Sequence, residues 1–164
     1  MKLIFIRHGQ AEPYCDDDAG RNLTEFGQTQ AAQTAEYITA RHTLDLIIAS
    51  PYNRADQTAK TLLAHANAAG QEPSFITVSS ITPDDDPNTA IADIDYAITS
   101  KFGDDTDDKC IAVVCHMPIV AYMVAHLDGL SPASFELAEC RVLTTHILAA
   151  DLGRCVDRFV PVQP

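Results

Sequence analysis

The chain opens with the stretch KLIFIRHG, residues 2–9, which passes from a hydrophobic run straight into two basic residues and a glycine. Its isoleucine and phenylalanine content predicts a buried β-strand over Lys2 to Arg7. In open α/β sheets, ligands bind outside the carboxyl ends of the strands. The same stretch therefore predicts the first strand of the fold and places Arg7, His8 and Gly9 where a ligand would bind.

Working outward from this stretch, short apolar runs alternate with amphipathic segments. Further strands are predicted at 44–49, 75–78, 110–115, 141–149 and 155–160, the last two as a hairpin around 151–153. Four helices are predicted. The first follows an N-cap at Thr24, and the second has Ser50 as N-cap, Pro51 in its first turn and Gly70 at its end. The third lies around 91–98 and the fourth over 118–127. This alternation indicates an α/β fold: a three-layer αβα sandwich with a mostly parallel central sheet. The length suits one domain over residues 1–164.

The charge of the chain excludes one large class of function. Eleven basic and 23 acidic side chains give a formal charge of -12, whereas a nucleic-acid binder needs a basic surface to displace counterions. We therefore expect no nucleic-acid partner, and a phosphate substrate would need a local basic site. The acidic runs at 16–18, 84–86 and 104–108 are interpreted as solvated loops.

The apolar runs and the cysteines indicate the cellular compartment in which the protein is expected. The longest apolar runs, such as 111–115, are far shorter than a bilayer span, so no membrane association is expected. The opening stretch lacks a small-residue cleavage site and is read as a strand, not a signal peptide. Five cysteines, odd in number and without a Cys-x-x-Cys pair, fit a reducing, cytoplasmic environment.

Two histidines and two arginines are predicted to meet on one rim of the sheet. Arg7 and His8 follow the first strand, Arg54 lies just after the second, and His116 follows the strand at 110–115. A histidine that attacks phosphorus must be neutral, because the protonated ring has no lone pair. Nearby arginines lower its pKa and bind phosphate oxygens bidentately. This set therefore predicts phosphoryl transfer, with Gly9 allowing a phosphate to approach the backbone closely.

Longer motifs surround these residues in a fixed order. Arg-His-Gly lies at 7–9, Leu-Thr-x-x-Gly-x-x-Gln-Ala at 23–31 and Ser-Pro-x-x-Arg-Ala-x-Gln-Thr at 50–58, and His116 follows a strand. Over residues 2 to about 127 the sequence resembles the histidine phosphatase superfamily, also called phosphoglycerate-mutase-like. Within that superfamily it is similar to the SixA-type protein-phosphohistidine phosphatases.

The resemblance implies a role for each matching residue. It makes His8 the phosphorylated nucleophile, Arg7 and Arg54 phosphate ligands, and His116 the second histidine of the site. Arg21 aligns with a SixA-type arginine that would reach the phosphate from its loop. No metal and no cofactor are implied, and a monomer is expected. The implied partner is a phosphohistidine-bearing protein, either a phosphotransfer domain or a phosphocarrier protein.

One departure from the superfamily pattern bears on the substrate. Many superfamily members that cleave phosphate esters resemble each other in having a glutamate after the third strand, which acts as general acid. In this chain the corresponding residues 81–86 read Ile-Thr-Pro-Asp-Asp-Asp and contain no glutamate. An alkoxide leaves poorly without protonation, whereas imidazole, with a conjugate-acid pKa of roughly 6.5, needs little help. Phosphohistidine is therefore favoured as substrate. The alternative is a small-molecule phosphomonoesterase in which Asp84, Asp85 or Asp86 is the acid.

Other interpretations rest on weaker patterns. Cys15 and Arg21 have the Cys-x5-Arg spacing of cysteine-dependent phosphatases, but three aspartates lie between them and would repel phosphate. Asp93-x-Asp95 falls inside a predicted helix, and no His-x-x-x-His pair suggests zinc. A non-catalytic module that binds phosphorylated proteins is also possible, although it would not need a nucleophile.

Overall fold

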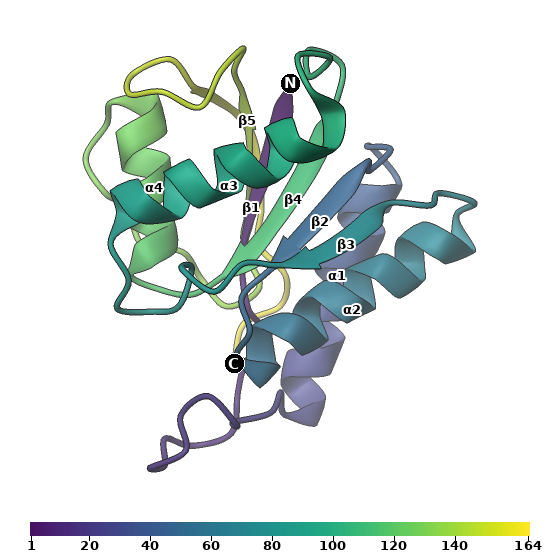
Figure 1. Cartoon of the computed structure of the whole chain (residues 1–164). Helices are drawn as coiled ribbons and strands as arrows, with labels where there is room; N and C mark the ends of the chain where they lie inside the picture. The colour runs from purple at the N-terminus through teal and green to yellow at the C-terminus, as the bar shows by residue number, and fades with distance from the viewer.

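A computed structural model describes residues 1–164 as six strands and four helices around one sheet (Figure 1). The strands are β1 (Lys2–Arg7), β2 (Leu46–Ala49), β3 (Ser74–Thr77), β4 (Cys110–Cys115), β5 (Cys140–Thr144) and β6 (Arg154–Phe159). The helices are α1 (Glu25–Thr39), α2 (Asn53–Ala68), α3 (Pro87–Phe102) and α4 (Ile119–Asp128). None of the four has the length and hydropathy needed to cross a bilayer.

The sheet has the strand order β3-β2-β4-β1-β5-β6. The pairs β2–β3, β2–β4 and β1–β4 are parallel, while β5 and β6 join antiparallel beside β1. The predicted mostly parallel sheet is confirmed. Because β1 and β4 are parallel neighbours, their carboxyl ends meet at one edge of the sheet.

Helices cover both faces of the sheet, as predicted. In Figure 1, α3 and α4 lie on one face and α1 and α2 on the other. Alternate residues of β1 point to the two sides: Leu3 and Phe5 join the core under α3 and α4, while Ile4 and Ile6 join the core under α1 and α2. Strands buried on both faces read as continuous apolar runs, which is why β1 and β4 are evident from the sequence.

Two details of the predicted elements are wrong. Ser50 does not cap α2; the helix begins at Asn53 after Tyr52, which makes no side-chain cap, and the Ser50 hydroxyl instead contacts His116. The predicted strand 141–149 ends at Thr144, because residues 145–153 form an irregular connection and not a tight hairpin. The cap at Thr24 is confirmed, since its side chain accepts from the Gly27 amide at 3.0 Å.

Two glycines let the segment after β1 lie against the start of α1. A Cβ on Gly9 would lie 2.5 Å from the Gly27 carbonyl oxygen, and a Cβ on Gly27 would lie 2.0 Å from the Gln10 carbonyl oxygen. No side chain fits at either distance. The two glycines therefore fix the chain that leaves His8 against α1.

Candidate active site

The rim where β1 and β4 end brings the two predicted histidines together. Arg7 and Cys115 are register partners, and the His8 amide donates to the Cys115 carbonyl at 3.0 Å. The centroids of the His8 and His116 rings are 5.1 Å apart. Parallel pairing of β1 with β4 thus places two rings side by side that are 108 residues apart in sequence.

His8 is held in one tautomer. Its Nδ1 lies 2.7 Å from the Gly9 carbonyl oxygen, which can only accept, so the proton is on Nδ1. Nε2 therefore carries the lone pair, and the Arg54 Nε–H donates to it at 3.2 Å. Only 8% of His8 is exposed. The available nucleophile is Nε2.

Arg54 comes from the first turn of α2 and is almost fully buried, with 3% exposed. Besides the bond to His8, its Nη1 donates to the Asp18 carbonyl at 2.7 Å and its Nη2 to the Asp18 carboxylate at 3.1 Å. The guanidinium also lies over the Tyr52 ring, 5.1 Å from its centroid. A planar cation fixed in this way is suited to holding an oxyanion beside Nε2 of His8.

His116 completes the pair of rings and is 1% exposed. Its Nε2 lies 2.7 Å from the Ser50 hydroxyl, and its Nδ1 is buried without a partner. The Ser50 oxygen also accepts from the Tyr52 amide at 3.5 Å. A serine hydroxyl can donate and accept at once, so the contact with His116 Nε2 fits either tautomer of the ring. Where the hydroxyl donates, the ring proton is on Nδ1.

Arg7 is the second guanidinium of the rim. Its Nη1 donates to the Phe135 carbonyl at 2.7 Å, and its Nε is buried without a partner. Buried polar groups are seldom left unpaired, because the unmade hydrogen bond costs about 1–3 kcal/mol. Arg7 Nε, a donor, and His116 Nδ1 are therefore two buried polar atoms of the same site that lack a hydrogen-bond partner.

Burial and charge keep both rings neutral. Burial lowers the pKa of His8 to about 3, with Arg54, Arg7 and Arg21 adding to the effect and the bond to Gly9 opposing it. Burial likewise lowers the pKa of His116 to about 2, helped by His8, Arg54 and Arg7. At neutral pH the site therefore contains two uncharged rings beside one buried guanidinium, Arg54, and one half-buried guanidinium, Arg7.

Arg21 and Asp18 extend this cluster into the loop before α1. Arg21 Nη1 donates to Asp18 Oδ1 at 2.7 Å, so the Asp18 carboxylate bridges Arg21 and Arg54. Hydrogen bonds from Arg21 and Arg54 lower the pKa of Asp18, more than its slight burial raises it. The interpretation of 16–18 as wholly solvated is wrong for Asp18, and no sequence motif marks this carboxylate as part of the site.

The remaining motif residues hold the backbone around the site. The Gly9 amide donates to Thr58 Oγ1 at 3.2 Å, and the Gln10 amide donates to the buried Gln30 side chain at 2.9 Å. Gln57 accepts from the Leu23 amide at 2.7 Å. The Gly9 amide is bonded to Thr58, and α1 fills the space that a Gly9 side chain would need. Packing against α1 therefore requires a glycine here, which is a different reason from the predicted close approach of phosphate.

The weaker sequence patterns lie outside the cluster. Asp85 accepts from the Thr82 amide and hydroxyl at 2.7 and 2.6 Å, and Asp86 caps α3 by accepting from the Thr89 amide at 2.9 Å. Cys15 is an exposed free thiol that contacts the Asp17 carbonyl. No three His, Cys, Asp or Glu side chains are grouped so that they could hold a metal ion.

Comparison with known proteins identifies the family of the chain. Residues 3–75 match the model of the histidine phosphatase superfamily (branch 1). The chain is 32% identical over 142 residues to a phosphohistidine phosphatase SixA homolog of Haemophilus influenzae, covering 82% of each chain. It is 26% identical over 146 residues to phosphohistidine phosphatase SixA of Escherichia coli, covering 88% of this chain and 85% of the other.

Solved structures share the fold. The protein histidine phosphatase SixA complexed with tungstate superposes with a TM-score of 0.81 at 24% identity, covering 98% of this chain and 97% of that one. A mycobacterial glucosyl-3-phosphoglycerate phosphatase superposes with a TM-score of 0.74 at 17% identity, covering 94% and 96%. These likenesses confirm the α/β architecture but, because both kinds of phosphatase share it, they do not distinguish between substrates. Because it shares 32% identity over 82% of its length with a SixA homolog, the chain belongs to the histidine phosphatase superfamily, in its SixA group, and is a phosphatase.

Proposed function

We propose that this phosphatase hydrolyses phosphohistidine on a signalling or phosphocarrier protein through a phospho-His8 intermediate. The observation that carries the proposal is the arrangement at His8 Nε2. This nitrogen is neutral, keeps its lone pair because Nδ1 is bonded to Gly9, and is adjacent to the Arg54 guanidinium. A binding module would need the cations but not a nucleophile held in one tautomer.

In the first step, His8 Nε2 attacks the phosphorus of the substrate. The substrate ring is protonated on its other nitrogen, so that as the new N–P bond forms and the bond between phosphorus and the substrate ring breaks, the ring leaves with the electron pair as neutral imidazole. Arg54 and Arg7 would offset the charge on the phosphoryl oxygens, and His116, with its proton on the unpartnered Nδ1, would donate to one of them. For the phosphorus to reach Nε2, the Arg54 Nε–H must turn from that nitrogen to a phosphoryl oxygen.

In the second step, water attacks phospho-His8. The water oxygen bonds to phosphorus, the N–P bond breaks with its electrons returning to Nε2, and the protons of the water are shared between phosphate and solvent. The reaction is covalent catalysis in two displacements and needs no other reactant.

The surroundings of the site favour phosphohistidine over a phosphate ester. A departing alkoxide needs an acid, and Asp85 and Asp86 are held by local hydrogen bonds within the turn before α3. None of Asp84, Asp85 and Asp86 hydrogen-bonds to His8, His116, Arg7 or Arg54. An imidazole leaving group does not need such an acid.

Trapping of the phosphoenzyme tests the nucleophile. A phosphocarrier protein, labelled on histidine with radioactive phosphoramidate, is mixed with the enzyme and quenched in alkali, in which phosphohistidine survives. We expect label on the wild type, none on His8→Ala, and retained label on the control His65→Asn, which changes a histidine of α2 outside the cluster. Label on His8→Ala would contradict the proposal.

Turnover measurements separate the two substrate classes. We expect hydrolysis of the labelled phosphocarrier protein to exceed hydrolysis of an alkyl phosphate ester such as glycerol phosphate, and Asp84→Asn, Asp85→Asn and Asp86→Asn to leave phosphohistidine hydrolysis unchanged. Loss of glycerol phosphate turnover in one of these variants, with negligible phosphohistidine turnover throughout, would instead establish a phosphomonoesterase.

A further inference from the structure

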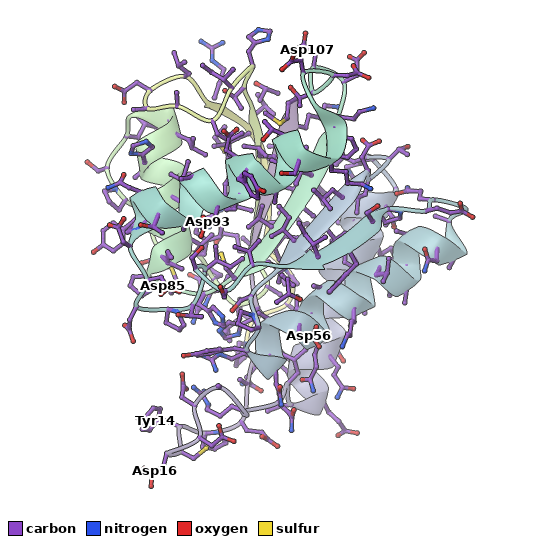
Figure 2. The ribbon with its side chains drawn as sticks, viewed as in Figure 1. Tyr14, Asp16, Asp56, Asp85, Asp93 and Asp107 are labelled. Atoms are coloured by element: carbon purple, nitrogen blue, oxygen red, sulfur yellow. The ribbon has the colours of Figure 1, made fainter.

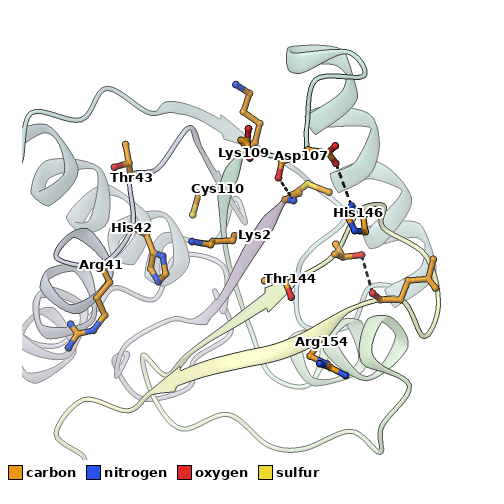
Figure 3. A pocket seen from close by; sticks show the side chains of 14 residues that line it. Lys2, Arg41, His42, Thr43, Asp107, Lys109, Cys110, Thr144, His146 and Arg154 are labelled. Atoms are coloured by element: carbon orange, nitrogen blue, oxygen red, sulfur yellow. Dashed lines mark hydrogen bonds and ion pairs between the residues drawn. The ribbon is translucent and has the colours of Figure 1, made fainter.

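A polar pocket of about 690 Å³ lies at the opposite end of the sheet from the two histidines (Figure 3). It is formed where β1 and β4 begin and β5 ends, since Lys2 is the register partner of both Cys110 and Thr144. His8 lies six positions after Lys2 along β1 and its end, or roughly 20 Å away at about 3.3 Å per residue. The pocket is therefore separate from the catalytic rim.

Positive charge is concentrated in this pocket although the protein is acidic. Four of the 11 basic residues line it, against two of the 23 acidic ones; the four are Lys2, Arg41, Lys109 and Arg154. Lys109 lies 4.0 Å from Asp105, whereas the other three form no ion pair. Unpaired cations gathered in one hollow of an acidic protein favour binding of anions.

The charges are arranged asymmetrically. Arg41 and His42 lie on one side of the pocket with Lys2 beside His42, while Asp107 lies on the other side, 3.6 Å from His146 (Figure 3). The Arg41 guanidinium is held over the Tyr37 ring at 3.9 Å from its centroid. An anion therefore has a cationic side to bind to, away from Asp107.

His42 supplies a second, independent indication. Both of its ring nitrogens are buried and neither has a hydrogen-bond partner. The catalytic mechanism makes no use of this ring. The side chain as a whole is half-buried, and if the ring turns toward the pocket a phosphate oxygen would give its N–H the acceptor that the protein does not provide.

We propose that this pocket is a second anion site, which binds a small molecule carrying several phosphate groups, such as a short polyphosphate or the phosphates of a nucleotide. Its volume suits a ligand of that size. Only three of its 14 lining residues are hydrophobic, so an apolar ligand would find little surface to match. Three cations without ion pairs suit a ligand with several negative charges better than a ligand with a single negative charge.

The test is a calorimetric titration of the full chain with inorganic tripolyphosphate, ATP and orthophosphate. The Arg54→Ala variant serves as the starting protein, because it weakens anion binding at the catalytic rim. We expect one site on this variant, tighter for tripolyphosphate or ATP than for orthophosphate, and weaker at high ionic strength. Comparable affinity for tripolyphosphate and ATP would identify the phosphate chain as the recognised group, and preference for ATP would identify a nucleotide.

Substitutions locate the site. Lys2→Gln and Arg41→Gln, each added to Arg54→Ala, should weaken tripolyphosphate binding by about fivefold or more, the value of one charge pair at about 4 Å in water. Lys60→Gln removes the same charge from the surface of α2, where Lys60 pairs with Asp56, and should change nothing. Thermal unfolding of each variant confirms that it is folded.

Three results would overturn the proposal. They are absence of binding to the Arg54→Ala protein, equal affinity for orthophosphate and tripolyphosphate, and binding that Lys60→Gln weakens as much as Lys2→Gln and Arg41→Gln do. Amide NMR shifts of the Arg54→Ala protein on addition of tripolyphosphate provide a second readout, which does not depend on whether the Lys2 and Arg41 variants fold. Shifts must appear at Lys2, Thr43 and Thr144 of the Arg54→Ala protein, and shifts confined to His8 and His116 would exclude this site.

Discussion

Asp18 occupies the outer edge of the Arg54 guanidinium, accepting from Nη2 through its carboxylate at 3.1 Å and from Nη1 through its carbonyl oxygen at 2.7 Å. The Asp18 side chain is 30% exposed, whereas Arg54 is nearly buried beneath it. A carboxylate thus lies where phosphoryl oxygens would bind to the same fork. In the free enzyme, the Asp18 carboxylate therefore occupies the part of Arg54 that a substrate phosphate would bind.

Removal of the Asp18 charge is expected to strengthen binding of oxyanions. Asp18→Asn keeps the size of the side chain but removes the charge that competes for Arg54 and Arg21, so the inhibition constant for tungstate should fall by about fivefold. Inhibition of phosphohistidine turnover measures it. Asp16→Asn is the matched control, because Asp16 lies near the tip of the same projecting loop (Figure 2) and makes no side-chain contact. If both variants changed the constant equally, the effect would be one of overall charge and not of this contact.

Ser50 is expected to act through His116. Loss of its hydroxyl in Ser50→Ala removes the hydrogen bond that positions the His116 ring through Nε2, and kcat should fall about tenfold with little change in KM, the effect of one hydrogen bond. The double variant with His116→Gln distinguishes positioning from packing. Ser50→Ala should have no further effect on kcat when His116 is already absent, and a full additional loss would contradict this role.

The two histidines should make the protein less stable in acid. Their pKa values in the folded protein, about 3 for His8 and about 2 for His116, lie below the ordinary value of about 6.5. The unfolded chain therefore binds protons that the folded protein does not as the pH falls below 6.5. Each ring lowers the free energy of unfolding by about 1.4 kcal/mol per pH unit between about 6 and 3, and neither contributes a slope above about 7.

Urea denaturation at pH 7, 6 and 5 measures this slope. His116→Gln should show a shallower slope than the wild type, whatever its stability at pH 7, because one of the two rings no longer titrates. Parallel slopes for the wild type and His116→Gln would show that burial of His116 has no linkage to pH.

Glu139 is expected to be the most sensitive acidic residue for stability. It is fully buried and accepts from Arg141 Nε at 2.6 Å and from Arg158 Nε at 2.6 Å and Nη2 at 3.0 Å. Glu139→Ala leaves two cations without their partner, so the free energy of unfolding should fall by about 3 kcal/mol. Urea denaturation at pH 7 measures the loss. The exposed Glu136→Ala should change it by less than about 0.5 kcal/mol, and similar losses in both variants would argue against the buried pair.

The local sequence was sufficient for much of the fold and for the identity of the catalytic candidates. Buried strands such as β1 and β4 read as apolar runs, and the cap at Thr24 depends only on residues three positions apart. His8, Arg7, Arg54 and His116 were found because each follows a strand or begins a helix. That placement brings them to one edge of any parallel sheet.

Only the tertiary structure decided how those residues are held. The carboxylate of Asp18 on Arg54, the hydroxyl of Ser50 on His116 and the Phe135 carbonyl on Arg7 join residues 36, 66 and 128 positions apart. Local patterns predicted that residues 16–18 are solvated and that Ser50 caps a helix, because secondary-structure propensity depends on near neighbours in the chain. Hydrogen bonding and burial depend on distance in space, which the pairing of β1 with β4 and the packing of α2 against the sheet determine.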